Sequence, residues 1–221
     1  RDAPTIRPVG VDDVVPATDL IDAETLQVEV LVNDYDPDGS TDDLVVSLPP
    51  GQEGVTVLED GRLSIPVPTQ RQVITYQLTD PDDEVTYAFV EVPGTEDTGP
   101  VLLPGTRLEV NSGEELVVDL QEWVVSLTGD PIQLYDLDGV TAANSDGGPY
   151  VVDETTLRFV SAPDFAGEAS ITFSVTDAPD VNADGILVSV LTIPIDVIAT
   201  SDQPPVLRNG SLDLEAGGDS Q

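Results

Sequence analysis

A seven-residue pattern occurs twice in this chain and limits its fold more than any other feature. Residues 74–80 read ITYQLTD, and residues 171–177, which lie 97 positions further on, read ITFSVTD. Four of the seven positions are identical, and the other three keep the same order of apolar and polar residues. Such alternation is typical of a half-buried β-strand. The chain is therefore predicted to contain two copies of one β-rich module.

The same alternation continues through both halves of the chain. Residues 25–32 place Leu26, Val28, Val30 and Val32 on one face and polar residues on the other. Clusters of Gly, Pro, Asp and Asn separate further runs of this kind, which is typical of strands joined by turns. These predicted strands lie near 44–48, 54–58, 62–67, 71–79, 84–92, 107–110, 115–120, 131–135, 156–160, 168–176 and 185–197. No segment with a helical period competes with them, so the predicted fold class is all-β, as tandem Greek-key β-sandwiches.

A second repeat marks where the modules begin. Residues 99–102 read GPVL and residues 204–207 read PPVL, and each follows a short polar stretch, near 94–99 and 199–204. We therefore predict a first sandwich over residues 1–97 and a second of the same type over 98–200. Residues 201–221 are predicted to be a linker and the start of a truncated third repeat, as in a chain taken from a longer array.

The charge of the chain excludes several classes of partner. Asp and Glu number 43 against 7 basic residues, all of them Arg, and the formal net charge is −36. Such a surface repels nucleic-acid phosphates and anionic membrane leaflets. No apolar run approaches the 18 residues of a membrane span, so no membrane insertion is expected in this segment. Cations are the natural partners of so acidic a chain.

The residue types that are missing also limit the chemistry. Cys, His and Met are all absent, so disulfides, zinc or haem sites and Ser-His-Asp catalysis are excluded. Pairs of acids of the kind that glycosidases use lack an aromatic-lined cleft or any other positioned group here. The chain is therefore predicted not to be an enzyme. Trp123, the single Trp, is interpreted as a packing residue rather than a platform for stacking sugars.

Two stretches resemble a known family. Residues 157–167 (LRFVSAPDFAG), with ITFSVTD after them, resemble the C-terminal half of the cadherin-like and immunoglobulin-like repeats of large bacterial surface adhesins. Residues 32–39 (VNDYDPDG), followed by LVV at 44–46, resemble the other half. The resemblance implies immunoglobulin-like or cadherin-like sandwiches on the cell surface, outside the cell. The chain departs from the pattern with PVPTQ at 66–70 and WVVS at 123–126, and the lack of Lys excludes the isopeptide bonds of some related modules.

Acidic loops suggest calcium. The loop from Asp34 has oxygen-bearing residues at alternate positions and Gly39 at the sixth, as in an EF-hand, but Val45 at the twelfth, where a Glu is required. In an immunoglobulin-like topology, the loops that follow 25–32 and 71–79 meet at the N-terminal pole of the first sandwich. The corresponding loops of the second sandwich would lie near the linker. The predicted Ca²⁺ ligands are Asp34, Asp36, Asp38, Asp42, Asp80, Asp82, Glu96, Asp97, Asp177, Asp180, Asn182 and Asp184.

These observations lead to one functional prediction and leave alternatives. The chain is predicted to be a non-catalytic extracellular spacer or stalk of a cell-surface adhesin, stiffened by calcium, whose partners are neighbouring repeats of the same parent chain. One alternative is an adhesion module that binds a surface glycan or protein, with residues 142–148 as the place to look. Another is a subunit that self-assembles into a surface filament or S-layer. The acidic loops also have a simpler interpretation as solvated turns.

Overall fold

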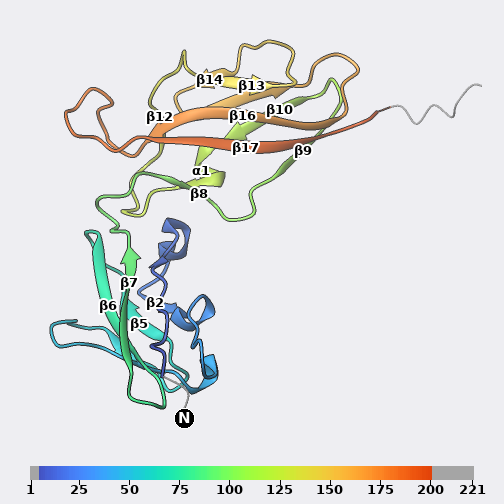
Figure 1. The fold of residues 1–221 in the computed structure, drawn as a ribbon. Coiled ribbons are helices and arrows are strands. Elements are labelled where there is room, and N and C mark those ends of the chain that lie inside the picture. The colour runs from blue at the N-terminus through green and yellow to red at the C-terminus, as the bar shows by residue number, and fades with distance from the viewer. Residues whose placement is uncertain (1–4, 201–221) are drawn as a thin grey trace, which may run out of the picture.

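The computed structural model describes residues 5–200. Strands dominate these residues, so the all-β fold class is confirmed. Buried apolar side chains form two separate clusters, one from residues between Val15 and Val92 and the other from residues between Leu108 and Val197. The strands around them form two groups, one in the first half of the chain and one in the second (Figure 1). We call the parts of the chain around these clusters the first unit, residues 5–97, and the second unit, residues 98–200. The third repeat predicted over residues 201–221 lies outside the described residues.

The first unit is a sandwich of two sheets. One sheet has the strand order β1-β7-β6-β3 and the other has the order β2-β5-β4. Strand β1 runs parallel to β7, whereas the other neighbouring strands are antiparallel. The strands are β1 (Asp13–Val14), β2 (Thr25–Val28), β3 (Val45–Ser47), β4 (Thr56–Val57), β5 (Leu63–Pro66), β6 (Gln72–Thr79) and β7 (Val85–Val92), with the 3-10 turns η1 (Ala17–Leu20), η2 (Val30–Val32) and η3 (Thr41–Asp43).

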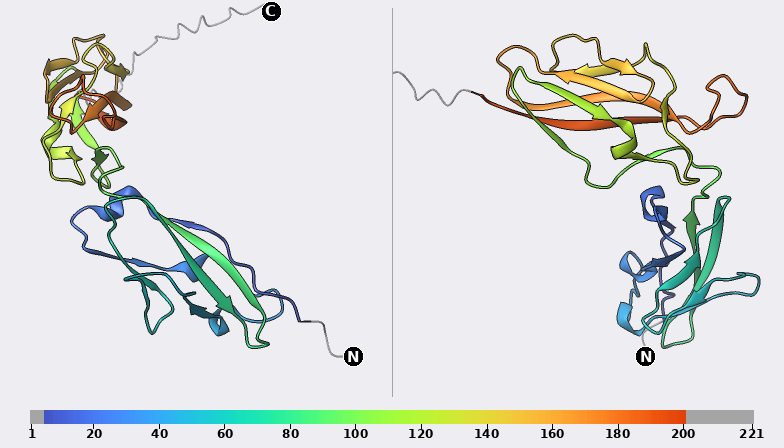
Figure 2. Two further views of the ribbon diagram at one scale, coloured as in Figure 1. Left: turned by 90° about the vertical axis from the view of Figure 1, so that its left-hand side faces the viewer. Right: turned by 180° about the vertical axis from the view of Figure 1, so that it is seen from behind.

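The second unit has the same order of strands. One sheet follows β12-β16-β17-β9, with β13 also paired to β16, and the other follows β10-β15-β14 (Figure 2). Strand β9 runs parallel to β17, as β1 does to β7, and β8 pairs with β11. The elements are β8 (Val101–Leu102), β9 (Leu108–Asn111), β10 (Glu115–Asp119), α1 (Leu120–Trp123), β11 (Val124–Val125), β12 (Gln133–Leu134), β13 (Thr141–Ala143), β14 (Val151–Asp153), β15 (Thr156–Val160), β16 (Gly167–Thr176) and β17 (Ser189–Ile198).

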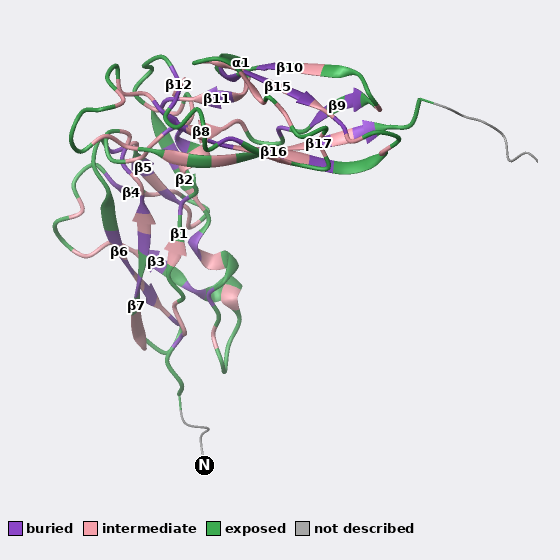
Figure 3. Cartoon of the chain, turned by 90° about the horizontal axis from the view of Figure 1, so that it is seen from above, coloured by how far each residue is buried: buried purple, intermediate pink, exposed green. Residues whose placement is uncertain are grey.

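The long strands show why this sequence forms sandwiches. Buried and exposed residues alternate along β6, β7, β16 and β17 (Figure 3). The two copies of the repeat lie on β6 and β16, and both place their apolar residues inside. Tyr76 and Phe173 hold the same position in the two copies, and their exposed fractions are 0% and 1%. Trp123 packs against the second core, as predicted.

Two local predictions were wrong. The strand expected over 25–32 ends at Val28, and η2 follows it. Val30 is buried while Val32 is 77% exposed, so the expected common face is lost after Val28. The helical turn α1 was not expected; the Asp119 side chain caps it by accepting a hydrogen bond from Gln121 N at 3.0 Å. Within residues 5–200, no helix is long and apolar enough to cross a membrane.

Candidate functional site

The N-terminal pole of the first unit gathers three segments. Val9 and Tyr35 exchange two backbone hydrogen bonds, of 2.8 and 3.1 Å, which joins the first residues of the chain to the loop after η2. Arg7 Nε lies 3.1 Å from Glu84 Oε2, in the loop between β6 and β7. The two loops that the sequence analysis assigned to this pole therefore do lie there together, with the start of the chain between them.

A buried hydroxyl organises this pole. Tyr76 points its hydroxyl at three acceptors: Asp34 Oδ2 at 2.9 Å, Val11 O at 3.2 Å and Asp13 Oδ2 at 3.3 Å. A tyrosine has a single hydroxyl proton, so it cannot serve all three at once. Asp34 also accepts a hydrogen bond from Val11 N through Oδ1, at 2.6 Å. The cluster thus ties residues 11–13 to the loop after η2 and to the central strand β6.

Burial raises the pKa values of the groups in this cluster. Asp34 is only 4% exposed, and desolvation raises the pKa of its carboxyl above the usual range. Desolvation also raises the pKa of Asp13, and the charges of Asp34 and Asp12 act in the same direction. The Tyr76 hydroxyl opposes both shifts. Burial, followed by the bond to Asp34, raises the pKa of Tyr76, so the phenol stays protonated and remains a donor.

Sequence reasoning missed Tyr76 and Asp13 as parts of a polar site. Tyr76 was treated as the counterpart of Phe173, in a position where only the ring mattered. The exchange of Tyr for Phe between the two repeats was the signal that could have found them, because a fully buried hydroxyl needs a partner in the first unit alone.

Besides Asp34, four of the predicted calcium ligands lie in the loops of this pole: Asp36, Asp38, Asp80 and Asp82. Asp36 Oδ1 accepts from Asp38 N at 3.3 Å, and Asp38 Oδ2 accepts from Ile6 N at 2.9 Å. Asp80 Oδ1 accepts from the backbone of Asp82 at 2.9 Å and of Glu84 at 2.8 Å. Partial desolvation, followed by the neighbouring charges of Asp38 and Asp80, raises the pKa of Asp36. The loops therefore bring these carboxylates close enough to interact.

Hydrogen bonds to the backbone already engage several of these carboxylates. Within the described part of the chain, no group of three or more Asp or Glu side chains is placed so that it could hold a metal ion. Calcium needs six to eight oxygen ligands, whereas oxygens of Asp34, Asp38 and Asp80 already accept backbone N–H groups. Calcium binding by the predicted set stays a prediction, and it requires these hydrogen bonds to be exchanged for bonds to the metal.

Asp42 lies apart from the other predicted ligands of the first unit. It is the second residue of the turn η3 and lines an open groove of about 640 Å³ together with Glu29, Val32 and Asp60. Arg62 also lines this groove, and its Nε lies 2.7 Å from Asp60 Oδ2, while its guanidinium donates to Gln27. The groove therefore already contains a cation, which lowers its need for a metal.

The linker acids face the first unit. Asp97 accepts hydrogen bonds from Arg71 N at 2.7 Å and from Gly94 N at 3.0 Å. The backbone of Glu96 donates to Thr69 O at 2.8 Å. A Cβ at Gly94 would collide with the backbone of Gln70, so the chain passes very close to the loop before β6. Residues 94–97 are thus fastened to the first unit.

The predicted ligands of the second unit form separate local bonds. Asp177 Oδ2 accepts from Ser126 Oγ at 2.6 Å, and Asp180 Oδ1 accepts from Asn182 N at 2.9 Å. Asp184 is exposed in the same loop between β16 and β17. Among the hydrogen bonds of residues 5–200, none joins these side chains to Glu96 or Asp97. A calcium site shared by these residues and the linker acids stays a prediction.

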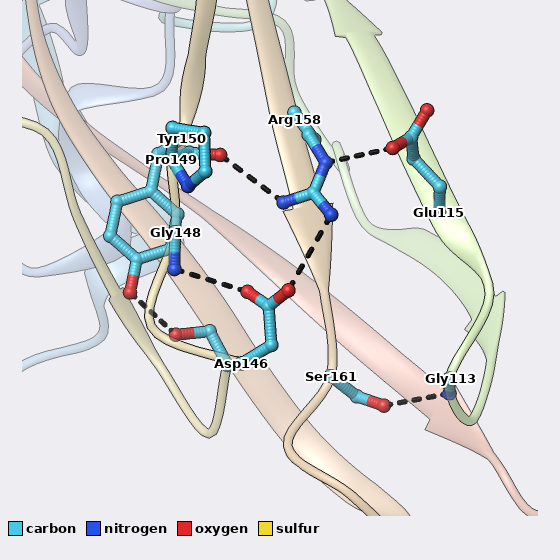
Figure 4. A network of polar contacts seen from close by, with 9 residues as sticks. Gly113, Glu115, Asp146, Gly148, Pro149, Tyr150, Arg158 and Ser161 are labelled. Atoms are coloured by element: carbon cyan, nitrogen blue, oxygen red, sulfur yellow. Dashed lines mark hydrogen bonds and ion pairs between the residues drawn. The ribbon is translucent and has the colours of Figure 1, made fainter.

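The segment singled out for partner binding, residues 142–148, is held by the body of the second unit. Arg158 on β15 bonds Glu115 Oε2 at 2.7 Å and Pro149 O at 3.2 Å, and it lies 3.5 Å from Asp146 Oδ2 (Figure 4). Asp146 accepts from Gly148 N at 3.1 Å. These contacts tie Asp146, and the residues that follow it, to β15.

A contact between the two units was also missed. Leu127, in the loop after β11, packs against the hydrophobic cluster of the first unit. Strand β8 lies close to η1 of the first unit. A single Leu in a turn carries no periodicity, so the sequence could not reveal this contact.

Comparisons with known proteins add the following findings. No family model matches the chain, and no curated protein matches it. Similar solved structures include the human desmocollin-1 ectodomain (12% identity, TM-score 0.31, 88% of this chain and 41% of that one). They also include immunoglobulin domains 1–4 of Sidekick-1 (10%, 0.27, 87% and 51%) and an endo-fucoidan hydrolase of glycoside hydrolase family 107 (17%, 0.28, 88% and 29%). The chain thus spans between 29% and 51% of the length of these three structures.

Proposed function

We propose that this chain is a non-catalytic spacer segment of an extracellular, cell-surface protein, in which β-sandwich modules are held in series. The observation that carries the proposal is the joint between the two units. Residues 94–97 are bonded to the first unit, and Leu127 of the second unit packs on the first core. A spacer needs joints that resist bending, and both features restrict the linker. The cell-surface location is supported by the resemblance of residues 32–39 and 157–167 to adhesin repeats.

The aspartates support a structural role. In the first unit Asp34, Asp80 and Asp97 each accept at least two hydrogen bonds, mostly from the backbone N–H groups of loops. Hydrogen bonds to charged groups are stronger than those between neutral groups, and each stabilises a loop that would otherwise be mobile. In this proposal the acids shape the loops at the poles of the sandwiches, and their charge keeps the chain soluble.

The hydrogen-bonded cluster of Tyr76, Asp34 and Asp13 is poorly placed for catalysis. Asp34 is buried, and Tyr76, which bonds it, has no exposed surface. The hydrogen-bonded residues around them hold the first strand in place. With no His, Cys or Lys in the sequence, a general base in this cluster would have to be one of its acids. We therefore assign this cluster to stability.

Small-angle X-ray scattering of a Leu127→Ser variant tests the spacer proposal. Removing the apolar contact is expected to loosen the joint, which raises the radius of gyration and gives a less rigid scattering profile. Leu137→Ser is the matched control, because Leu137 belongs to the same unit and is 47% exposed. Its profile is expected to match that of the wild type. A flexible wild-type profile that Leu127→Ser does not change would refute a stiff joint.

Thermal melting tests the calcium prediction. If the acidic loops bind calcium with the affinity of extracellular modules, ~10⁻⁴–10⁻³ M, then calcium at ten times the Kd stabilises the fold by about 1.4 kcal/mol. The melting temperature of the first unit is then expected to rise in calcium but not in magnesium at equal ionic strength. Asp36→Asn together with Asp38→Asn should remove the rise, whereas Glu53→Gln should keep it. Equal rises in the two salts would mean screening of charge rather than a site.

A further inference from the structure

The outer face of one sheet in the first unit carries almost no charge. On β6 and β7 the inward residues, such as Ile74, Leu78 and Val90, belong to the core. The single charged residue that β6 and β7 direct outward is Glu91, whose Oε2 lies 2.7 Å from a guanidinium nitrogen of Arg71. Asp12 lies at the edge of this surface, where its Oδ1 accepts a hydrogen bond from Phe89 N at 3.1 Å. Two carboxylates, Asp12 and Glu91, therefore flank a surface that is otherwise free of charged side chains on β6 and β7. We call it the neutral face and define it by the outward residues Val73, Thr75, Gln77, Thr79, Tyr87 and Phe89.

Two aromatic rings stand on the neutral face beside hydrogen-bonding side chains. Tyr87 is 55% exposed and Phe89 is 44% exposed. Their Cα atoms are about 7 Å apart, because residues two apart on a strand are separated by twice its rise. The register of β6 and β7 places Gln77 opposite Tyr87 and Thr75 opposite Phe89. Gln77 Nε2 donates to Thr79 Oγ1 at 3.1 Å, which orients the amide next to the Tyr87 ring.

The second unit shows that the sandwich itself does not require these rings. Its repeat aligns Thr75 with Thr172, and Thr172 pairs with Thr192 on β17 in the same register as Thr75 with Phe89. By the same alignment Tyr87 corresponds to Val190. Strands β16 and β17 therefore carry no aromatic side chain at these two positions, although the strand order is the same. One exposed ring, Tyr135, lies beside this face, where its backbone N–H donates to Ser174 O at 2.8 Å. Neither Tyr87 nor Phe89 belongs to the first core. Two exposed rings side by side, outside the core, form an apolar surface that a partner could cover.

We propose that the neutral face binds an uncharged polysaccharide. Charge decides between the candidate partners. A net charge of −36 repels sulfated or phosphorylated polymers, and a second copy of the chain would bring the same charge again. A cationic partner would be attracted to the acidic loops, away from this face. A neutral glycan is neither repelled by the net charge nor attracted to the acidic loops.

The chemistry of the face matches such a ligand. Aromatic rings offer flat apolar surfaces to the C–H faces of sugar rings, while the Gln77 amide and the Thr75 hydroxyl can exchange hydrogen bonds with sugar hydroxyls. A sheet face is extended rather than hollow, so it suits several sugar units of a polymer better than a single small molecule, which needs a concave pocket. This inference uses a surface that the joint between the units does not involve, so it stands or falls separately from the spacer proposal.

Affinity electrophoresis in native gels tests the proposal with four neutral probes: hydroxyethyl cellulose, galactomannan, glycogen and arabinoxylan. The wild-type chain is expected to be retarded by at least one of them. In a variant with both Tyr87→Thr and Phe89→Thr, the dissociation constant for that probe is expected to rise roughly tenfold or more. Threonine is favoured in strands, so the sheet should be kept. Tyr135→Thr is the matched control, because Tyr135 is a 44% exposed ring in the second unit, and it should be retarded like the wild type.

Further measurements decide between the partners. Melting curves of the double variant should match those of the Tyr135→Thr control, which shows that the fold is intact. Carboxymethyl cellulose and dextran sulfate, which are anionic, should cause no retardation. The proposal is overturned if none of the four neutral polymers retards the wild type, if the double variant is retarded equally, or if the anionic polymers bind as well. Sedimentation equilibrium that shows a wild-type dimer, lost in the double variant, would overturn it in favour of a second copy.

Discussion

Leu63→Ala is expected to destabilise the first unit by about 2–5 kcal/mol and to leave the melting of the second unit unchanged, whereas Leu157→Ala should do the reverse. Both side chains have no exposed surface, and they lie on β5 and β15, the equivalent central strands of the two smaller sheets. Each belongs to a different hydrophobic cluster. Removing a buried Leu loses its burial energy and leaves a cavity that neighbouring side chains fill only in part.

Differential scanning calorimetry measures this effect. Two transitions are expected in the wild type, and each variant should lower only one of them. Val152→Ala removes a side chain that is 57% exposed and provides the control, with both transitions near their wild-type positions. A single transition that moves in both Leu variants would mean that the units unfold together as one cooperative body.

Tyr76→Phe should produce the second large effect, a loss of about 1–3 kcal/mol from the first unit at neutral pH. The ring is kept, and Phe173 shows that the same fold position accepts a Phe. What is lost is the donor for Asp34 Oδ2 and Asp13 Oδ2, which then remain desolvated without it. Urea denaturation measures the change. Tyr87→Phe removes an exposed hydroxyl and should leave the urea midpoint nearly unchanged.

The loss of stability caused by Tyr76→Phe should depend on pH. Burial raises the pKa of Asp13 and Asp34 in the folded state above the unfolded value of about 3.9. Their contribution to stability is therefore fully present below that value, and it is lost as pH rises through the folded-state pKa. Tyr76 limits this loss by bonding the charged carboxylates. The difference between wild type and Tyr76→Phe should therefore be larger at pH 7 than near pH 4. Asp12 and Asn33 also face the cluster, and Asn33 Nδ2 donates to Asp13 Oδ1 at 3.0 Å in both proteins. A loss that is equal at both pH values would contradict this account.

Much of the fold could be predicted because its signal is local and repeated. The strands β6 and β16 alternate over many residues, and their likeness to each other identified equivalent positions before any coordinates were used. The shared pole of two loops followed from topology, since strands of a sandwich alternate in direction. Very short strands such as β1 and β8 have two residues each, too few for any alternation to appear.

The acidic residues were harder to interpret because a turn and a metal site use the same residue types. The sequence around Asp34, Asp80 and Asp97 is that expected of calcium ligands. In the structure, backbone N–H groups donate hydrogen bonds to their carboxylate oxygens, and some of these donors are distant in the sequence. Val11 is 23 residues from Asp34, and Arg71 is 26 residues from Asp97. No spacing rule connects such pairs. The role of the Tyr76 hydroxyl was hidden for the same reason, since Asp34 is 42 residues away.

The parallel pairing of β1 with β7, and of β9 with β17, has a mechanical consequence. Because an early strand and the last strand of each unit run in the same direction, the chain enters a unit at one end and leaves it at the other. Tension along the chain then pulls the two parallel strands of a unit past each other in shear. In the second unit, the four residue pairs between β9 and β17 carry this load together instead of opening one after another. The first unit has only two such pairs, so under stretching it should be the one that yields first.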